Sequence, residues 1–185
     1  KITVRLADMG FAVRSVDVTG AGDAIAHSIV VATEVYDGQS LFSVDPDAVR
    51  ARVEALPMVR SATVARLWPD RISIVVETRE AFALWQVEGV LNIIDRDGVV
   101  LAEADVMNPP ALPLVVADGA NDSVVEIVEA LARHPAIRAH VVGAVRVGER
   151  RWNLRLDTGA DVKLPAGDVQ ASIAILARLQ AERGV

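Results

Sequence analysis

The stretch at 56–89, LPMVRSATVARLWPDRISIVVETREAFALWQVEG, decides the fold of this chain. Two runs rich in β-branched residues, 59–67 and 71–77, lie on either side of the turn Trp68-Pro69-Asp70. The second run alternates apolar and polar side chains, which is typical of a strand with one buried face. The sequence therefore predicts two consecutive strands joined by a tight turn.

The residues before this pair predict one further strand and two helices. A β-branched, partly alternating run at 11–19 is expected to form the strand. Asp23 is expected to cap the first helix with its carboxylate. Asp45 followed by Pro46 predicts the start of the second helix, which Pro57 ends. The order strand, helix, helix, strand, strand indicates a compact α+β unit.

A second unit, β-rich with flanking helices, is expected after Arg79. Its strands are predicted at 82–87, 90–94, 99–101 and 141–147 and in a hairpin over 152–164. Its helices are predicted after the capping box Ser123-x-x-Glu126, ending at Pro135, and after Gly167-Asp168. The predicted organisation is an N-terminal helix or linker at 1–10, a first domain at 11–80 and a β domain at 81–185.

The composition excludes several kinds of chemistry. The chain has 185 residues, of which 52% are hydrophobic, enough to bury a core. Its 19 basic and 25 acidic residues give a net charge of −6, which argues against a nucleic-acid partner. There is no cysteine, so thiol catalysis, disulfides and cysteine-ligated zinc are excluded. No apolar run approaches the roughly 18 residues of a membrane span.

Two glycine-containing motifs have a catalytic or metal-binding alternative. Gly20-Ala21-Gly22-Asp23 resembles the phosphate-binding signature of ribokinase-like sugar kinases, but the alternating strands and helices of a nucleotide domain are missing around it. Asp95-x-Asp97-Gly98 lacks the further oxygen ligands of a calcium loop. We therefore interpret both as turns, and a kinase remnant stays the third alternative. The histidines are too scattered to predict a metal site: His27, His134 and His140.

Two tryptophans and a basic pair are candidates for protein contacts. Trp68 and Trp152 have the side chain favoured at interface hot spots, although core or sheet-edge packing is the preferred interpretation for each. Arg150 and Arg151 precede Trp152 and either pair with an acidic partner or form a solvated hairpin tip. No catalytic residue, cofactor site or metal site is predicted, so the sequence indicates a binding module and not an enzyme.

Short motifs along nearly the whole chain match one known family. They are Leu56-Pro57-Met58-Val59, Val64-Ala65-Arg66-Leu67-Trp68-Pro69, Glu77-Thr78-Arg79, Ala83-Leu84-Trp85, Gly10-Phe11, Val16 to Gly20, Leu41 to Asp45, Ile94-Asp95-x-x-Gly98, Trp152-x-Leu154-x-Leu156 and Leu164. Together they resemble the FtsQ family of bacterial cell-division proteins, called DivIB in other lineages. One departure is Met58, where the family usually has Trp, and a second is that the family continues past the last helix with another strand.

This resemblance implies a fold, a location and partners. Residues 11–79 resemble a POTRA domain (β-α-α-β-β), and 82–185 resemble the family's β domain without its C-terminal strand. The resemblance implies a non-catalytic division scaffold, anchored in the inner membrane by one helix before Lys1, with this part in the periplasm at the septum. The implied partners are FtsB, FtsL, FtsW, FtsI and FtsN.

We expect a sheet edge of the second domain to accept a strand from such a partner. The alternative class is the POTRA module of an outer-membrane assembly or secretion protein. The candidate partner-binding residues are Arg150, Arg151, Trp152, Asn153 and Arg155.

Overall fold

The computed structural model describes residues 10–183, and the chain divides into two compact units between Arg79 and Glu80. The short helix predicted at 2–9 lies outside the described residues. Each unit has its own buried hydrophobic core, so each is described by itself. No helix in the described part of the chain is both long and apolar enough to cross a membrane.

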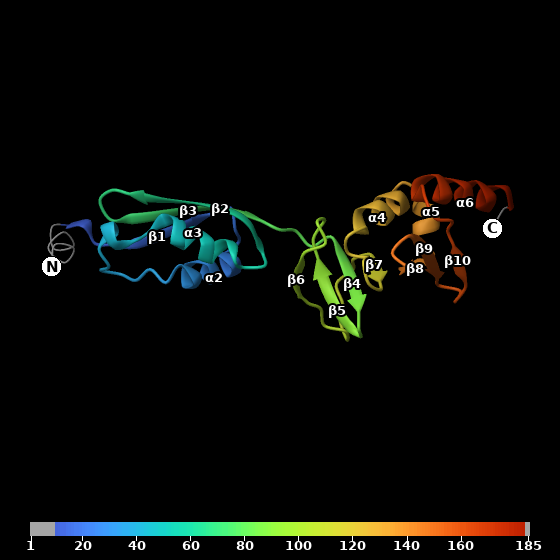
Figure 1. Cartoon of the computed structure of the whole chain (residues 1–185), viewed down its shortest axis with the longest axis horizontal. Helices are drawn as coiled ribbons and strands as arrows, with labels where there is room; N and C mark the ends of the chain where they lie inside the picture. The colour runs from blue at the N-terminus through green and yellow to red at the C-terminus, as the bar shows by residue number, and fades with distance from the viewer. Residues whose placement is uncertain (1–9, 184–185) are drawn as a thin grey trace. The chain divides into compact units, whose positions relative to one another are not determined.

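The first unit is a three-stranded sheet covered on one face by two helices (Figure 1). The strand order is β1-β3-β2, with β1 parallel and β2 antiparallel to the central β3. Its elements are β1 (Ser15–Thr19), α2 (Asp23–Thr33), the 3-10 turn η2 (Leu41–Ser43), α3 (Pro46–Glu54), β2 (Val59–Leu67) and β3 (Arg71–Thr78). The core between the sheet and the helices includes Ile29, Leu41, Val49, Val53, Ile72 and Ile74.

Local chemistry explains how the two helices of this unit begin. The Asp45 carboxylate accepts a hydrogen bond of 3.0 Å from the Asp47 amide, and Pro46 occupies the first helical position, as predicted. The prediction for Asp23 was wrong. Gly22 is the residue before the helix, and Asp23 lies inside the first turn without a capping hydrogen bond. Its charge there still favours the positive helix end.

The first strand is shorter than predicted. The sheet ladder begins at Ser15, whereas Val13 exchanges hydrogen bonds of 2.8 and 2.9 Å with the loop residues Gln39 and Gly38. Ala12 forms an isolated bridge to Ser40. The residues before Ser15 therefore hold the loop after α2 instead of extending the sheet.

The second unit is a seven-stranded mixed sheet with order β10-β9-β8-β7-β4-β5-β6 (Figure 1). Its elements are β4 (Ala83–Val87), β5 (Val90–Ile94), β6 (Val100–Glu103), β7 (Leu114–Val116), α4 (Val124–Ala132), α5 (Pro135–Arg138), β8 (Val141–Val147), β9 (Arg151–Leu156), β10 (Asp161–Lys163) and α6 (Val169–Arg183). The helices contribute Val124, Ile127, Leu131, Ile137 and Ile173 to a core that the sheet completes with Ile94, Val115, Trp152 and Leu154.

Three predictions for this unit need correction. No strand was predicted at β7, which links the hairpin β4–β5 to β8 by parallel pairing on both sides. Ser123 precedes α4 but forms no side-chain capping bond, so the predicted capping box is absent. Pro135 starts the one-turn helix α5 instead of ending α4, which already ends at Ala132. Proline is favoured at that first position because its missing N–H is not needed there.

Candidate partner-binding surface of the second unit

The predicted binding residues lie on β9 and on the turn before it. Paired side chains of neighbouring strands lie on the same face of a sheet, and consecutive residues point to opposite faces. Trp152 and Leu154 point towards the helices and are fully buried. Arg151, Asn153 and Arg155 therefore share the opposite face, while Arg150 lies in the β8–β9 turn.

Trp152 is a core residue and not a surface contact. Its side chain has an exposed fraction of 0%, which agrees with the preferred interpretation of core packing and leaves this candidate binding residue without a surface for direct partner contact. The Arg146 guanidinium lies 4.9 Å from the centre of the Trp152 ring and 3.7 Å from a carboxylate oxygen of Glu126 on α4. Trp152 thus anchors β9 to the helical layer and fixes the direction in which its neighbours point.

Arg150, Arg151 and Asn153 have unused hydrogen-bonding capacity. In the described part of the chain neither arginine forms an ion pair, and Arg150 is exposed. The Arg151 Nε and the Asn153 Oδ1 are buried and have no hydrogen-bond partner among the described residues. A buried polar atom without a partner costs about 1–3 kcal/mol, and a docked polar group can recover that energy after a rotamer change.

Arg155 differs from the other candidates because it already has a partner. Its guanidinium donates two hydrogen bonds to the Asp161 carboxylate on β10, one of them 3.1 Å long. The hydrogen bonds and charge of Asp161 raise the pKa of Arg155 above its ordinary value. The pair is exposed and links the last two strands, so the charge of Arg155 is already matched within the sheet.

The strand β10 ends the sheet among the described strands. The Leu156 amide donates to Ala160 O and the Leu164 amide to Trp152 O, both at 2.9 Å. In an antiparallel ladder such bonds recur at every second residue. The backbone N–H and C=O groups of Asp161 and Lys163 therefore face away from β9. This edge meets the geometric requirement for addition of another strand.

The turn at Gly20 to Asp23 has a packing explanation. Gly20 adopts φ +93°, and a Cβ at this position would lie 2.0 Å from the Val76 carbonyl oxygen. Only glycine permits both the conformation and the close approach. Gly22, by contrast, has no atom within 4 Å of such a Cβ. The motif thus joins β1 to α2 across the adjacent strand β3.

The Asp95 loop is a hairpin turn built around a buried carboxylate. One Asp95 oxygen accepts hydrogen bonds from the Asp97 and Val99 amides, at 2.9 and 2.8 Å. His140 lies 3.0 Å from Asp157 as an isolated pair. Within residues 10–183, no group of three or more His, Cys, Asp or Glu residues could hold a metal ion.

An aromatic cluster on the first unit was not foreseen. Trp68 is 56% exposed, so of the two packing interpretations, core or sheet edge, the core one is wrong. Its ring lies 5.7 Å from Phe11 and 4.9 Å from Phe42, centre to centre, and those two rings lie 5.6 Å apart. The three residues are far apart in sequence, so no local pattern predicts the cluster, and only the family motif around Trp68 pointed to this position.

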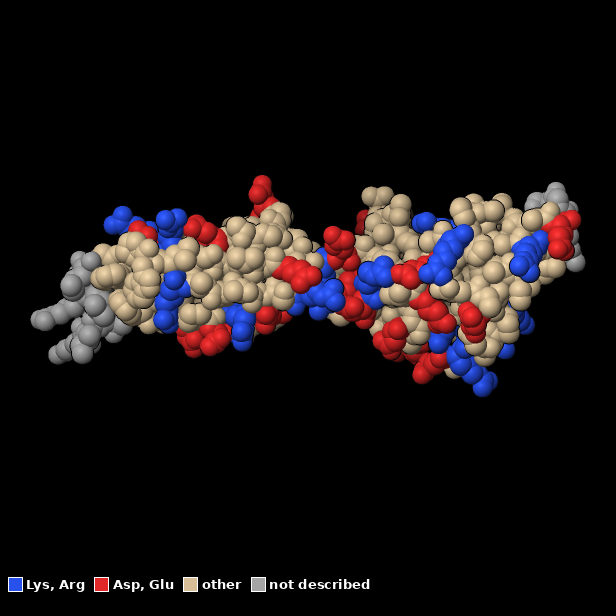
Figure 2. Space-filling model, turned by 90° about the horizontal axis from the view of Figure 1, so that it is seen from above, with Lys and Arg blue, Asp and Glu red and all other residues tan. Residues whose placement is uncertain are grey.

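Charged residues of both signs alternate over the viewed face of the second unit (Figure 2). The fold and this surface define a class of protein: a POTRA-type domain followed by a β-rich domain with an accessible sheet edge. The model of the FtsQ-type POTRA domain matches 11–79, and the model of the FtsQ/DivIB C-terminal region matches 83–184. The chain belongs to the FtsQ/DivIB family of cell division proteins.

Curated relatives agree with this assignment. Cell division protein FtsQ of Bradyrhizobium diazoefficiens is 40% identical over 94% of this chain and 51% of its own length. The FtsQ protein of Caulobacter vibrioides is 39% identical over 94% of this chain and 57% of its own. The chain thus spans about half the length of the curated relatives it matches.

A solved structure of the major extracytoplasmic domain of DivIB from Geobacillus stearothermophilus covers 58% of this chain and 97% of its own, at 16% identity. Its TM-score of 0.40 is too low to support an argument. The family match to the second unit removes the alternative of a POTRA module from an outer-membrane assembly or secretion protein.

Proposed function

We propose that this protein is a non-catalytic scaffold of the division machinery that binds FtsB, and through it FtsL, at the β8–β10 end of the second unit. The observation that carries the proposal is the outward-facing backbone of β10 beside the unpaired Arg150 and Arg151. An added strand obtains its affinity from main-chain hydrogen bonds, and the nearby charges select the partner.

The sheet on this side also suits the strand that the family resemblance implies after α6. In one arrangement this strand pairs with the outer backbone of Asp161 and Lys163, and the partner strand pairs with its far side. In the other, the partner strand itself pairs with β10. Both arrangements extend the same sheet and differ in which chain contributes the strand next to β10.

The charges favour an acidic partner segment. Arg150, Arg151 and Lys163 contribute three positive charges near this edge, whereas Asp161 is already paired with Arg155. An acidic side chain gains most next to Arg151, whose Nε is desolvated and lacks a partner. Exposed charges contribute mainly to orientation and association rate, so the effect is expected to fall with added salt.

The remaining parts of the proposal follow from the family. The full protein is proposed to have one inner-membrane helix, to place these two domains in the periplasm at the septum, and to act with FtsW, FtsI and FtsN. No nucleic acid, cofactor or enzymatic step belongs to the proposal.

The test uses the full-length protein and the purified FtsB–FtsL complex from the same organism. Charge reversal of both arginines, Arg150→Glu and Arg151→Glu, is expected to weaken binding at least about tenfold, measured by biolayer interferometry. The matched control is Arg50→Glu on α3, an exposed arginine of the first unit. Unchanged affinity of the double variant, with binding of the native protein intact, would reject this surface as the site.

A further inference from the structure

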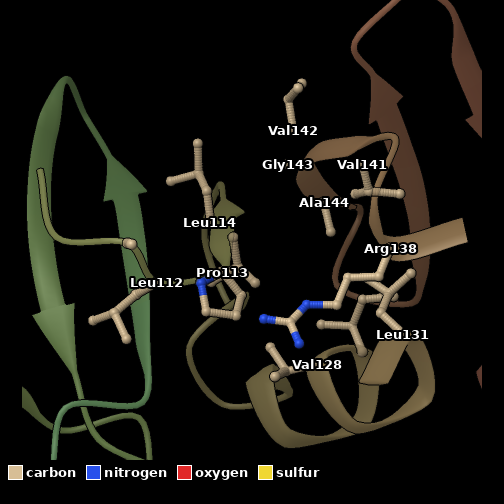
Figure 3. A pocket seen from close by; sticks show the side chains of 13 residues that line it. Leu112, Pro113, Leu114, Val128, Leu131, Arg138, Val141, Val142, Gly143 and Ala144 are labelled. Atoms are coloured by element: carbon tan, nitrogen blue, oxygen red, sulfur yellow. The ribbon is translucent and has the colours of Figure 1, made fainter. Parts of the chain in front are cut away.

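A groove opens inside the sheet where β7 and β8 diverge (Figure 3). These parallel strands pair only at Val115–Ala144 and Val116–Val145. Before this point the chain at 111–114 and the start of β8 border a cavity of about 190 Å³, which α4 closes on a third side. The short length of β7 is the reason why the sheet separates here.

The groove has a buried apolar floor and partly open apolar walls. Val142 on its rim lies at the bulge of β8, between Val141 and Gly143, and is 53% exposed. The floor consists of Val115, Ile127, Leu131 and Ala144, all buried, and the walls of Leu112, Pro113, Leu114, Val128 and Val141. An engineered apolar cavity of roughly 150 Å³ binds benzene, so this volume suits one large apolar side chain.

One cation lies over this apolar surface. Arg138, the last residue of α5, is the sole charged residue among those that line the groove. Its guanidinium points into the groove between Pro113 and Val128 (Figure 3). Arg138 forms no ion pair with any residue of the described chain. A guanidinium presented this way favours a carboxylate, which it can bind through two parallel hydrogen bonds.

We propose that this groove binds a segment of another protein that presents a bulky apolar side chain with an Asp or Glu beside it. The apolar side chain would fill the cavity over Ile127 and Ala144, and the carboxylate would pair with Arg138. We infer a peptide chain as the occupant because the volume suits one large side chain and Arg138 provides a charge that an adjacent acidic residue can match.

This second docking site rests on the proposed function only in that the protein works by binding other proteins. Its residues come from α4, α5, β7 and the start of β8, whereas the proposed FtsB surface comes from the β8–β9 turn, β9 and β10. Variants can therefore change one site and leave the other intact.

The experiment selects a phage-displayed random heptapeptide library on the immobilised full-length protein. Native protein is expected to enrich peptides with Leu, Ile, Phe or Met within two positions of Asp or Glu. A parallel selection on the Arg138→Glu protein is expected to enrich peptides that carry Lys or Arg in place of the acidic residue. The tightest-binding peptide from the selection on native protein is then synthesised. Its affinity is expected to fall about tenfold for the Arg138→Gln protein, and by a similar factor when the Asp or Glu of the peptide is replaced by Asn or Gln.

The controls separate this site from the other one and from unfolding. Arg150→Glu is expected to leave peptide affinity unchanged, and Arg138→Glu to leave FtsB affinity unchanged. Val142→Asp is expected to weaken the same peptide, with a thermal midpoint close to that of the native protein. Failure to enrich acidic peptides, or equal affinity of native and Arg138→Gln protein, overturns the proposal. Sedimentation experiments test whether a second copy of the protein is the occupant instead. Self-association of the native protein that is lost in Val142→Asp would overturn the proposal.

Discussion

Arg155 on β9 and Asp161 on β10 face each other in register and form a two-point ion pair across the last ladder of the sheet. The strand β10 has only three residues and pairs on one side. The pair adds to the backbone hydrogen bonds at Leu156 and Leu164 that hold this short strand in register. Because both side chains are about half exposed, its contribution to stability is expected to be small.

The pKa direction of Arg155 sets the pH dependence of this contribution. Because the pKa is raised in the folded protein, the stabilisation is complete below the unfolded-state pKa and is lost only as the pH rises through the folded-state value. Arginine titrates far above neutrality. The difference in thermal midpoint between native protein and Arg155→Gln is thus expected to be equal at pH 7 and pH 9. A difference that shrinks over this range would contradict the assignment.

Burial of Trp152 leads to a prediction about stability. Replacing Trp152 by Ala removes the largest fully buried side chain and is expected to lower the free energy of unfolding of the second unit by about 3–5 kcal/mol. Urea unfolding followed by circular dichroism measures this loss. Trp68→Ala, in the exposed aromatic cluster of the first unit, is the control and should leave the transition of the second unit unchanged.

The two glycines of the turn before α2 are expected to respond differently to the same substitution. Gly20→Ala places a Cβ against the Val76 carbonyl at φ +93° and should cost about 2–4 kcal/mol. Gly22→Ala meets no atom and should cost no more than about 1 kcal/mol, which reflects only the preference for glycine over alanine before a helix. Equal costs in thermal unfolding would show that close packing on β3 is not the reason for Gly20.

The buried carboxylate of Asp95 gives a test of the turn interpretation. Asp95→Ala leaves the Asp97 and Val99 amides without their acceptor and is expected to destabilise the second unit by about 1–3 kcal/mol. Excess calcium is expected to leave the thermal midpoint of the native protein unchanged, because ligand binding to the folded state would raise it. A calcium-dependent increase that Asp95→Ala abolishes would restore the calcium-loop alternative.

Features fixed by neighbouring residues could be predicted from the sequence. The start of α3 depends on Asp45 and Pro46 alone, and the strands on both sides of Trp68 show their period over eight or nine residues. The alternation of Trp152, Leu154 and Leu156 likewise predicted the strand that the structure shows at β9. Local pattern was therefore sufficient for the order of strands and helices in the first unit, but not for the cap at Asp23 or the start of β1.

Features that depend on distant pairing could not be predicted. The three residues of β7 resemble any short apolar run and become a strand only because β4 and β8 lie on both sides. The groove beside Arg138 depends on that strand, so it had no sequence signal either. The position of Asp23 could not be predicted either, because aspartate is favoured both as the capping residue and within the first helical turn.

Arg66 connects β2 to the loop before α3, a contact that the sequence pattern does not predict. Its guanidinium donates hydrogen bonds of 2.9 and 2.5 Å to the carbonyl oxygen of Val44, next to the capping residue Asp45. Arg66→Met keeps the aliphatic length but leaves the buried carbonyl without a donor. We expect a loss of about 1.5–3 kcal/mol in the unfolding of the first unit.

The matched control for this prediction is Arg71→Met, on the next strand. Arg71 is 56% exposed and pairs with Asp17 at 3.7 Å, so its loss should cost less than about 1 kcal/mol. Added salt should reduce the small effect of Arg71 and leave that of Arg66, because exposed ion pairs are screened and a partly buried bond to a carbonyl is screened much less. If both substitutions cost the same and respond equally to salt, the Arg66–Val44 tether is not what holds this loop.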